Sequence, residues 1–401
     1  MTTLQAHLEK YSKEELRHYA GSLGLSLSRS LKKAEMALAI AGELLREDTL
    51  RRRMGTLTDE QIRLLERAMA EPCRPEDREM GDALRLDDLH YGIYSETEGL
   101  LRIPEDVAAC YRKLSCRAFH HYRRRVAWLI KCLYFAETLF GVTPIDHLYG
   151  IYMDHPCFKV SRERFMYYLV QIPSDLRDCF ITDQYIVSGA WHEIEDCRRL
   201  LTSQAGREYY SPLWEEVDEL WRENCLAGGG SWKALEEWLK TPEGMGEKLS
   251  GDVVCELWNR LAGGAPFEEA ALWLAELLPL PDGETLQTMM ELLREAAGET
   301  RMLFNRGFTW KEIAEKEDAS ALVCQVLIMP GSSAAASRER RLEKSLRDKG
   351  FIPEYRIRAD FLPALRGQPL YPADPCPCGS GRSYIRCCGR DWTGKHRLEE
   401  T

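Results

Sequence analysis

The chain has 401 residues, of which 44% are hydrophobic and 29% charged, a composition typical of folded domains that excludes a largely disordered protein. Its formal net charge of −10 is unevenly divided, because residues 1–55 carry +3, residues 337–401 carry +5 and the part between them carries −18. A polyanion is therefore expected to meet the ends of the chain first. The alternative is that these charges are ordinary solvated helix faces.

The length allows two or three domains, and we expect a mainly α, multi-helical fold with two short hairpin units and a small C-terminal module. No run of about 18 apolar residues occurs, so no membrane span is expected. The first ten residues lack the basic and then apolar pattern of a secretion signal, and the cysteines outside the C-terminal region are scattered. These features predict a cytoplasmic protein.

Residues 1–55 are predicted to form a helical hairpin. Ser12 and Glu15 have the spacing of a capping box, an apolar helical face follows, and a second helix is expected to begin near Leu31. The pattern resembles the SAP and Rho-N families of helix, extended loop, helix modules, which bind DNA or RNA. The resemblance implies phosphate contacts from Arg29, Lys32 and Lys33, and Arg51-Arg52-Arg53 extend the basic side into a linker. A plain helical hairpin with solvated lysines is the alternative.

Residues 56–140 are predicted to form a winged-helix-like unit and a long helix. A capping box at Thr58 and Gln61, a short helix at 84–89 and two apolar runs around the turn at 95–99 give the order helix, helix, hairpin. Winged-helix modules read DNA in some proteins and dock proteins in others, and the acidic surroundings argue here against reading a DNA groove. The long helix, 117–140, carries three consecutive arginines that we interpret as a solvated face or as salt bridges: Arg123, Arg124 and Arg125.

Residues 141–329 are predicted to form a helical body. Thr143-Pro144 is expected to cap one helix, Ser161 to begin the next, and residues 182–184 to turn a second hairpin, which suggests a second winged-helix-like unit in tandem. Six tryptophans are expected to pack between helices: Trp214, Trp221, Trp232, Trp238, Trp258 and Trp273. Residues 330–370 are predicted to be a linker and a charged helix.

Residues 371–392 hold four cysteines arranged as C-x-C, a gap of eight residues, then C-C: Cys376, Cys378, Cys387 and Cys388. Two short cysteine pairs joined by a tight turn suit the tetrahedral coordination of Zn²⁺. Disulfides or free thiols are the alternatives, although the adjacent Cys387 and Cys388 would hardly bridge each other without strain. The segment is too short to bury a core, so metal binding would supply its folding energy.

The Cys-Pro-Cys-Gly-Ser-Gly run from Cys376, the aromatic Tyr384 and the closing Cys-Cys-Gly resemble the SEC-C motif. That motif is best known from the C-terminal tail of the protein-translocation ATPase SecA and also ends many otherwise unrelated bacterial proteins. The resemblance implies that the four cysteines bind Zn²⁺ and that a chaperone or ribosomal surface contacts Arg382, Tyr384 and Arg386. Ser383 stands where the family often has lysine, which weakens the expectation of an identical partner.

The sequence contains no phosphate-binding loop, dinucleotide-binding fingerprint, zinc-protease helix or nucleophile elbow. We therefore predict a non-enzymatic cytosolic zinc-binding adaptor that binds nucleic acid, the ribosome or a protein through its terminal modules. The alternative is a DNA-binding transcriptional regulator that uses the tandem winged-helix-like units. An enzyme would need a site assembled from scattered residues such as Asp146, His147, Asp154 and His155.

Overall fold

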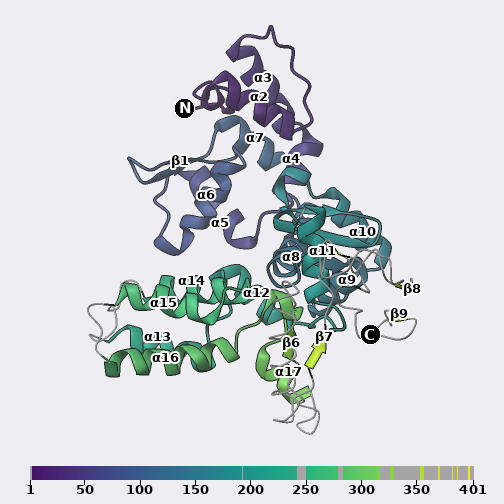
Figure 1. Ribbon diagram of the computed structural model, residues 1–401. Helices are drawn as coiled ribbons and strands as arrows, with labels where there is room; N and C mark the ends of the chain where they lie inside the picture. The colour runs from purple at the N-terminus through teal and green to yellow at the C-terminus, as the bar shows by residue number, and fades with distance from the viewer. Residues whose placement is uncertain are drawn as a thin grey trace. The chain divides into compact units, whose positions relative to one another are not determined.

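A computed structural model of the protein describes residues 2–191, 193–241, 250–278 and 283–316, together with short pieces at 326–328, 353–355, 369–370, 382, 386 and 396–397. The chain divides into two compact units (Figure 1). Unit 1 comprises Met1–Phe135 and Ile145–Cys179, and unit 2 comprises Ala136–Pro144 and Phe180–Thr401. The described part is mainly helical with small sheets, as predicted.

Unit 1 is built from ten helices, of which the eighth continues into unit 2, and one β-hairpin. The α-helices are α1 (Leu4–Leu8), α2 (Lys13–Ser22), α3 (Lys33–Leu44), α4 (Glu47–Met54), α5 (Asp59–Ala70), α6 (Met80–Asp88), α7 (Glu105–Leu114), α8 (Arg117–Leu139), α9 (Ile145–Asp154) and α10 (Arg162–Gln171). The hairpin strands are β1 (Ile93–Ser95) and β2 (Leu100–Arg102), and two short 3₁₀ turns are η1 (Asp77–Glu79) and η2 (Ser174–Leu176).

Unit 2 combines a three-stranded sheet with a run of helices. The sheet contains β3 (Val142–Pro144), β4 (Cys179–Ile181), whose first residue belongs to unit 1, and β5 (Tyr185–Ser188). The helices are η3 (Gly189–Trp191), α11 (Ile194–Ser203), α12 (Trp214–Glu223), α13 (Gly230–Leu239), α14 (Ser250–Ala262), α15 (Phe267–Leu277), α16 (Gly283–Gly298), η4 (Leu303–Asn305) and α17 (Trp310–Lys316). Further along, β6 (Val326–Ile328) pairs with β7 (Pro353–Tyr355), and β8 (Pro369–Leu370) with β9 (His396–Arg397).

The N-terminal helices begin where the sequence predicts. Ser12 and Glu15 form a reciprocal capping box, in which the Ser12 amide donates to the Glu15 carboxylate at 2.6 Å. The second helix begins at Lys33, two residues after the predicted start, and α1 and α2 pack against it. The apolar face that makes this packing possible is fully buried: Leu4, Leu8, Leu16, Met36 and Ile40.

The three arginines at 51–53 correct one expectation, because they lie on α4 and not in a linker. Arg51 and Arg52 are exposed, whereas Arg53 is buried and pairs with Asp175 at 2.5 Å. A buried guanidinium needs such a partner, since an unpaired charge in a protein interior is strongly destabilising. Arg53 therefore holds unit 1 together and does not extend a basic surface.

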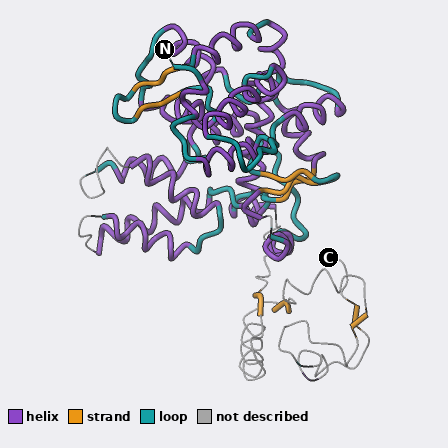
Figure 2. Tube along the Cα trace, turned by 90° about the horizontal axis from the view of Figure 1, so that it is seen from above, coloured by secondary structure: helices purple, strands orange, loops and turns teal. Residues whose placement is uncertain are grey.

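The predicted first hairpin is present (Figure 2). Ile93 pairs with Arg102 and Ser95 with Leu100, so the turn spans the polar residues named from the sequence. The backbone of Cys73 also exchanges hydrogen bonds with that of Leu101, which adds a single bridge to the buried middle of β2. The order helix, helix, hairpin is confirmed.

The long helix α8 ends one residue before the predicted position, and its arginines form the predicted salt bridges. Arg123 is buried, donates to the carbonyl of Leu57 at 2.7 Å and pairs with Asp59. Arg124 pairs with the same carboxylate at 3.3 Å. Two of the three arginines thus fasten α8 to the start of α5.

Acid is expected to weaken this connection through Asp59. Burial acts to raise the pKa of Asp59, but hydrogen bonds and charge from Arg123 and Arg124 together lower that pKa below its usual range. A carboxyl whose pKa is lowered by folding stabilises the protein at pH values above its pKa in the unfolded chain, which is about 3.9. This stabilisation is lost as the pH falls through the pKa of the folded state. The stability difference between wild type and Asp59→Asn, from urea denaturation, should therefore shrink below about pH 4. A difference that stays constant contradicts the assignment, and Glu60→Gln, at an exposed neighbouring carboxylate, is the control.

The second predicted hairpin is also present, with β5 between β3 and β4 in the sheet. Thr143 and Pro144 directly precede the next helix, as expected, and they also form the end of strand β3, which pairs antiparallel with β5 and was not predicted. The edge of β5 supplies hydrogen-bonding partners that a single stretch of sequence does not reveal. Helix α9 begins directly afterwards at Ile145.

Helices α13 to α16 pack on one another in unit 2, with α13 against both α14 and α16, and α15 against the same two helices (Figure 1). Trp232 and Trp258 are fully buried in this group, as expected of packing tryptophans. The other four of the six tryptophans expected to pack between helices are half-buried.

Candidate functional sites

The four predicted zinc ligands Cys376, Cys378, Cys387 and Cys388 lie outside the described residues, as do Tyr384 and most of the linker and charged helix at 330–370. Arg382 and Arg386 are described, and both are exposed.

Two of the predicted nucleic-acid contacts, Arg29 and Lys32, lie in the segment that joins α2 to α3, and Lys33 is the first residue of α3. Arg29 and Lys32 are exposed and Lys33 is half-buried. The segment is fastened to α2 by hydrogen bonds from Lys13 to the carbonyl of Leu31 and from Arg17 to that of Arg29, both 3.4 Å long. Within the described residues, no carboxylate forms an ion pair with any of the three predicted contacts.

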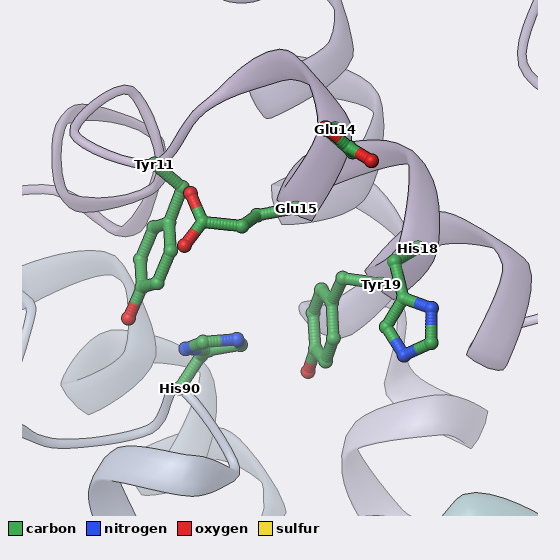
Figure 3. Close-up of a pocket in the computed structure, with 6 residues that line it drawn as sticks. All are labelled: Tyr11, Glu14, Glu15, His18, Tyr19 and His90. Carbon is green, nitrogen blue, oxygen red and sulfur yellow. The ribbon is translucent and has the colours of Figure 1, made fainter.

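A pocket of about 390 Å³ opens beside α2, and the sequence analysis missed it. Its lining is aromatic and acidic: Tyr11, Glu14, Glu15, His18, Tyr19 and His90 (Figure 3). The available signal was the spacing of Glu15 and Tyr19, which are four residues apart on α2 and therefore share one side of the helix, while Tyr11 precedes the helix. His90 comes from the turn after α6, so no local pattern connects it with the others.

Two of the residues considered for an enzyme site, Asp146 and His155, have other partners. Helix α9 runs unbroken through Gly150, and Asp146 at its start pairs with Arg162 at 2.7 Å. The ring of His155 stacks on Phe158 at 4.2 Å, and its Nδ1 accepts from the amide of Cys157. In the part of the chain that the structure describes, no group of three or more His, Cys, Asp or Glu is placed to hold a metal ion.

Arg301 is the centre of a polar network in unit 2. Its guanidinium pairs with Glu216 at 2.8 Å and Glu312 at 3.1 Å, donates to the hydroxyl of Tyr210 at 2.6 Å, and lies 3.5 Å from the centre of that ring. It also donates to the carbonyl of Gly307, a residue whose φ of 83° favours glycine. This arginine therefore holds the turn that contains Gly307.

Taken together, the described part is a mainly α-helical protein with small sheets, and none of its helices has the length and apolar character needed to cross a bilayer. Residues 373–390 match the family model of the SEC-C motif, a motif associated with zinc binding. The match contains all four predicted ligands and confirms the resemblance seen in the sequence. Comparison with curated proteins and with solved structures finds no match.

Proposed function

We propose that this chain is a non-enzymatic zinc-binding adaptor of the cytoplasm that binds nucleic acid, the ribosome or a protein through its terminal modules. The SEC-C match at residues 373–390 supports the proposal, because that motif is associated with zinc binding and the matched residues include four cysteines at a spacing that suits zinc. Four thiolates fill the coordination sphere and leave no open position for substrate, which is the mark of a structural site.

At the C-terminal module, zinc would fix the backbone around Tyr384 and present it together with Arg382 and Arg386. Aromatic and arginine side chains are the residue types most enriched where proteins bind each other. The exposure of both arginines fits a contact surface of this kind. A chaperone or ribosomal protein is the partner that the SEC-C resemblance favours.

At the N-terminal module, Arg29, Lys32 and Lys33 are the proposed phosphate contacts. Three features support them: a helix, extended segment, helix arrangement, the absence of ion-pair partners among the described residues, and a net positive charge over residues 1–55. Cations that form no ion pair within the protein can replace counterions on a nucleic-acid backbone, and the release of those counterions drives binding.

The triple variant Arg29→Ala, Lys32→Ala, Lys33→Ala tests this contact. We expect weaker binding to RNA or DNA, with a slope of log affinity against log salt that is smaller by about 2 to 3, because each lost phosphate contact removes about 0.7 to 0.9. Fluorescence anisotropy with single-stranded RNA, duplex DNA and purified ribosomes measures both quantities. An unchanged affinity and slope for all three would remove the nucleic-acid part of the proposal. The control replaces three exposed arginines of unit 2: Arg198, Arg199 and Arg222.

A DNA-binding regulator is the second candidate, and the two hairpins favour it. The β1–β2 hairpin follows α5 and α6 and has an added bridge from Cys73, while the β4–β5 hairpin follows α9 and α10. This order suits two winged-helix-like units. The discriminating result is a preference for one duplex sequence that persists in the triple variant, since that variant leaves both hairpins intact.

A further inference from the structure

The pocket beside α2 has the form of a box with aromatic walls. The ring of Tyr19 stands at 87° to the ring of His90, with 4.3 Å between their centres, and the ring of Tyr11 stands at 73° to it, with 5.4 Å between centres. Figure 3 shows the two tyrosine rings on either side of the space, with His90 across one end. Three rings thus bound a single volume.

The rings present a surface that attracts cations. The face of an aromatic ring is the negative part of its quadrupole and draws a cation that lies within about 6 Å of its centre. His90 would repel a cation if it were protonated, but burial, with smaller effects from the charges of His7 and Arg53, lowers its pKa to about 4. The imidazole is therefore neutral at physiological pH, and burial raises the pKa of Tyr19 to about 12, so that ring keeps its proton.

Two carboxylates lie at the rim of the pocket, and both are exposed. The amide and hydroxyl of Ser12 donate to Glu15 and lower its pKa, which keeps the carboxylate charged. Positive groups also lie nearby: Lys33 interacts with Glu15, and Arg53 donates to the hydroxyl of Tyr19 at 3.4 Å. The charge of Arg53 is offset by its ion pair with Asp175. The two rim carboxylates therefore make the electrostatic potential at the pocket entrance negative.

His90 is held in a backbone conformation that costs stability. Its φ is 59°, and the amide of Tyr91 donates back to the carbonyl of Leu86, which is the pattern of a helix end where glycine is preferred. A non-glycine residue is disfavoured in this left-handed region because its Cβ comes close to the following carbonyl oxygen. Nδ1 of His90 is also buried without a hydrogen-bond partner among the described residues. Such local strain is typical of functional positions.

We propose that Tyr11, Tyr19 and His90, with Glu15 at the rim, form a binding site for a methylated ammonium cation. The aromatic walls remove water from the methyl groups, the ring faces attract the charge, and Glu15 guides the cation to the entrance. The volume lies within the range of ordinary small-ligand pockets. The cation is either a free small molecule or the methylated end of a lysine side chain on another protein. This site is independent of the proposed zinc and nucleic-acid functions.

The full-length protein is tested by isothermal titration calorimetry with two probes of the same shape. Choline carries the quaternary ammonium, and 3,3-dimethylbutan-1-ol replaces its nitrogen with carbon and is neutral. Choline is expected to bind at least about tenfold more tightly. Equal affinity for the two probes, or no binding of any cation tested, overturns the proposal. A short peptide with trimethyl-lysine is compared with choline and with its unmodified form to separate a protein source from a free ligand.

Variants locate the site. Tyr19→Leu is expected to weaken binding of choline about tenfold, whereas Tyr19→Phe keeps the ring, loses only the hydroxyl and should bind as wild type does. Glu15→Gln preserves the capping hydrogen bond and removes the charge, so a loss of about threefold is expected with α2 intact. Tyr185→Leu, at a half-exposed tyrosine of unit 2, is the control. Circular dichroism verifies folding. If Tyr19→Leu fails to fold, the single variants Glu15→Gln and Tyr11→Leu are used instead, and unchanged choline binding by both overturns the proposed site.

Discussion

The purified chain is expected to carry one Zn²⁺ ion, and the variant Cys387→Ser, Cys388→Ser to carry none. Loss of two of four thiolates leaves only Cys376 and Cys378, which cannot close a tetrahedral site. Zinc per chain, measured by inductively coupled plasma mass spectrometry against protein concentration, gives the result directly. The exposed cysteines Cys116 and Cys157 supply the control, because replacing both with Ser leaves the SEC-C motif intact and should leave one ion bound.

The size of this effect follows from what holds so short a segment. Structural zinc sites of peptide size contribute apparent binding free energies of about 10 to 16 kcal/mol near neutral pH, and this energy is used for folding. Removal of the ion with a chelator should therefore make residues 371–392 sensitive to protease while the helical content, followed by circular dichroism, is unchanged. A chain that contains no zinc as purified, or that keeps zinc without Cys387 and Cys388, contradicts the assigned ligands.

Arg301→Met is expected to destabilise unit 2 by about 2 to 3 kcal/mol, which is less than the loss for a fully buried ion pair because Glu216 and Glu312 remain partly exposed. The side chain of Arg301 is only 14% exposed, and its removal leaves Glu216 and Glu312 with neighbouring negative charges and no shared cation. The turn that contains Gly307 loses a hydrogen bond at the same time. The midpoint of urea denaturation, with the slope of the transition, measures the change.

The control for this variant is Arg222→Met, on helix α12 of the same unit. Arg222 is 60% exposed and lies 3.5 Å from Asp218, so its replacement should cost less than about 1 kcal/mol. Equal effects of the two substitutions would show that Arg301 is an ordinary surface residue. Methionine is used at both positions because it keeps the aliphatic length and helix preference of arginine while removing the charge.

Capping boxes, turns and helix ends were predicted correctly from the sequence because each depends on interactions between residues close together in the chain. The capping box of Ser12 and Glu15, the β1–β2 turn and the end of α8 each depend on residues within a few positions of one another. Strand β3 escaped prediction for the opposite reason: Val142 pairs with Val187, forty-five positions later, and nothing near Val142 indicates that partner.

The sequence by itself determined several helix starts to within two residues, both hairpins and the SEC-C motif, because capping groups, turn residues and clustered cysteines are close together in the chain. Tertiary structure alone decided the role of each charged or aromatic side chain. Arg53 is buried against Asp175 although its neighbours Arg51 and Arg52 are exposed, and His90 completes an aromatic pocket with Tyr19. The physical reason is that the burial of a side chain and its interaction partners depend on which distant segments fold against each other. Composition and local spacing do not contain that information.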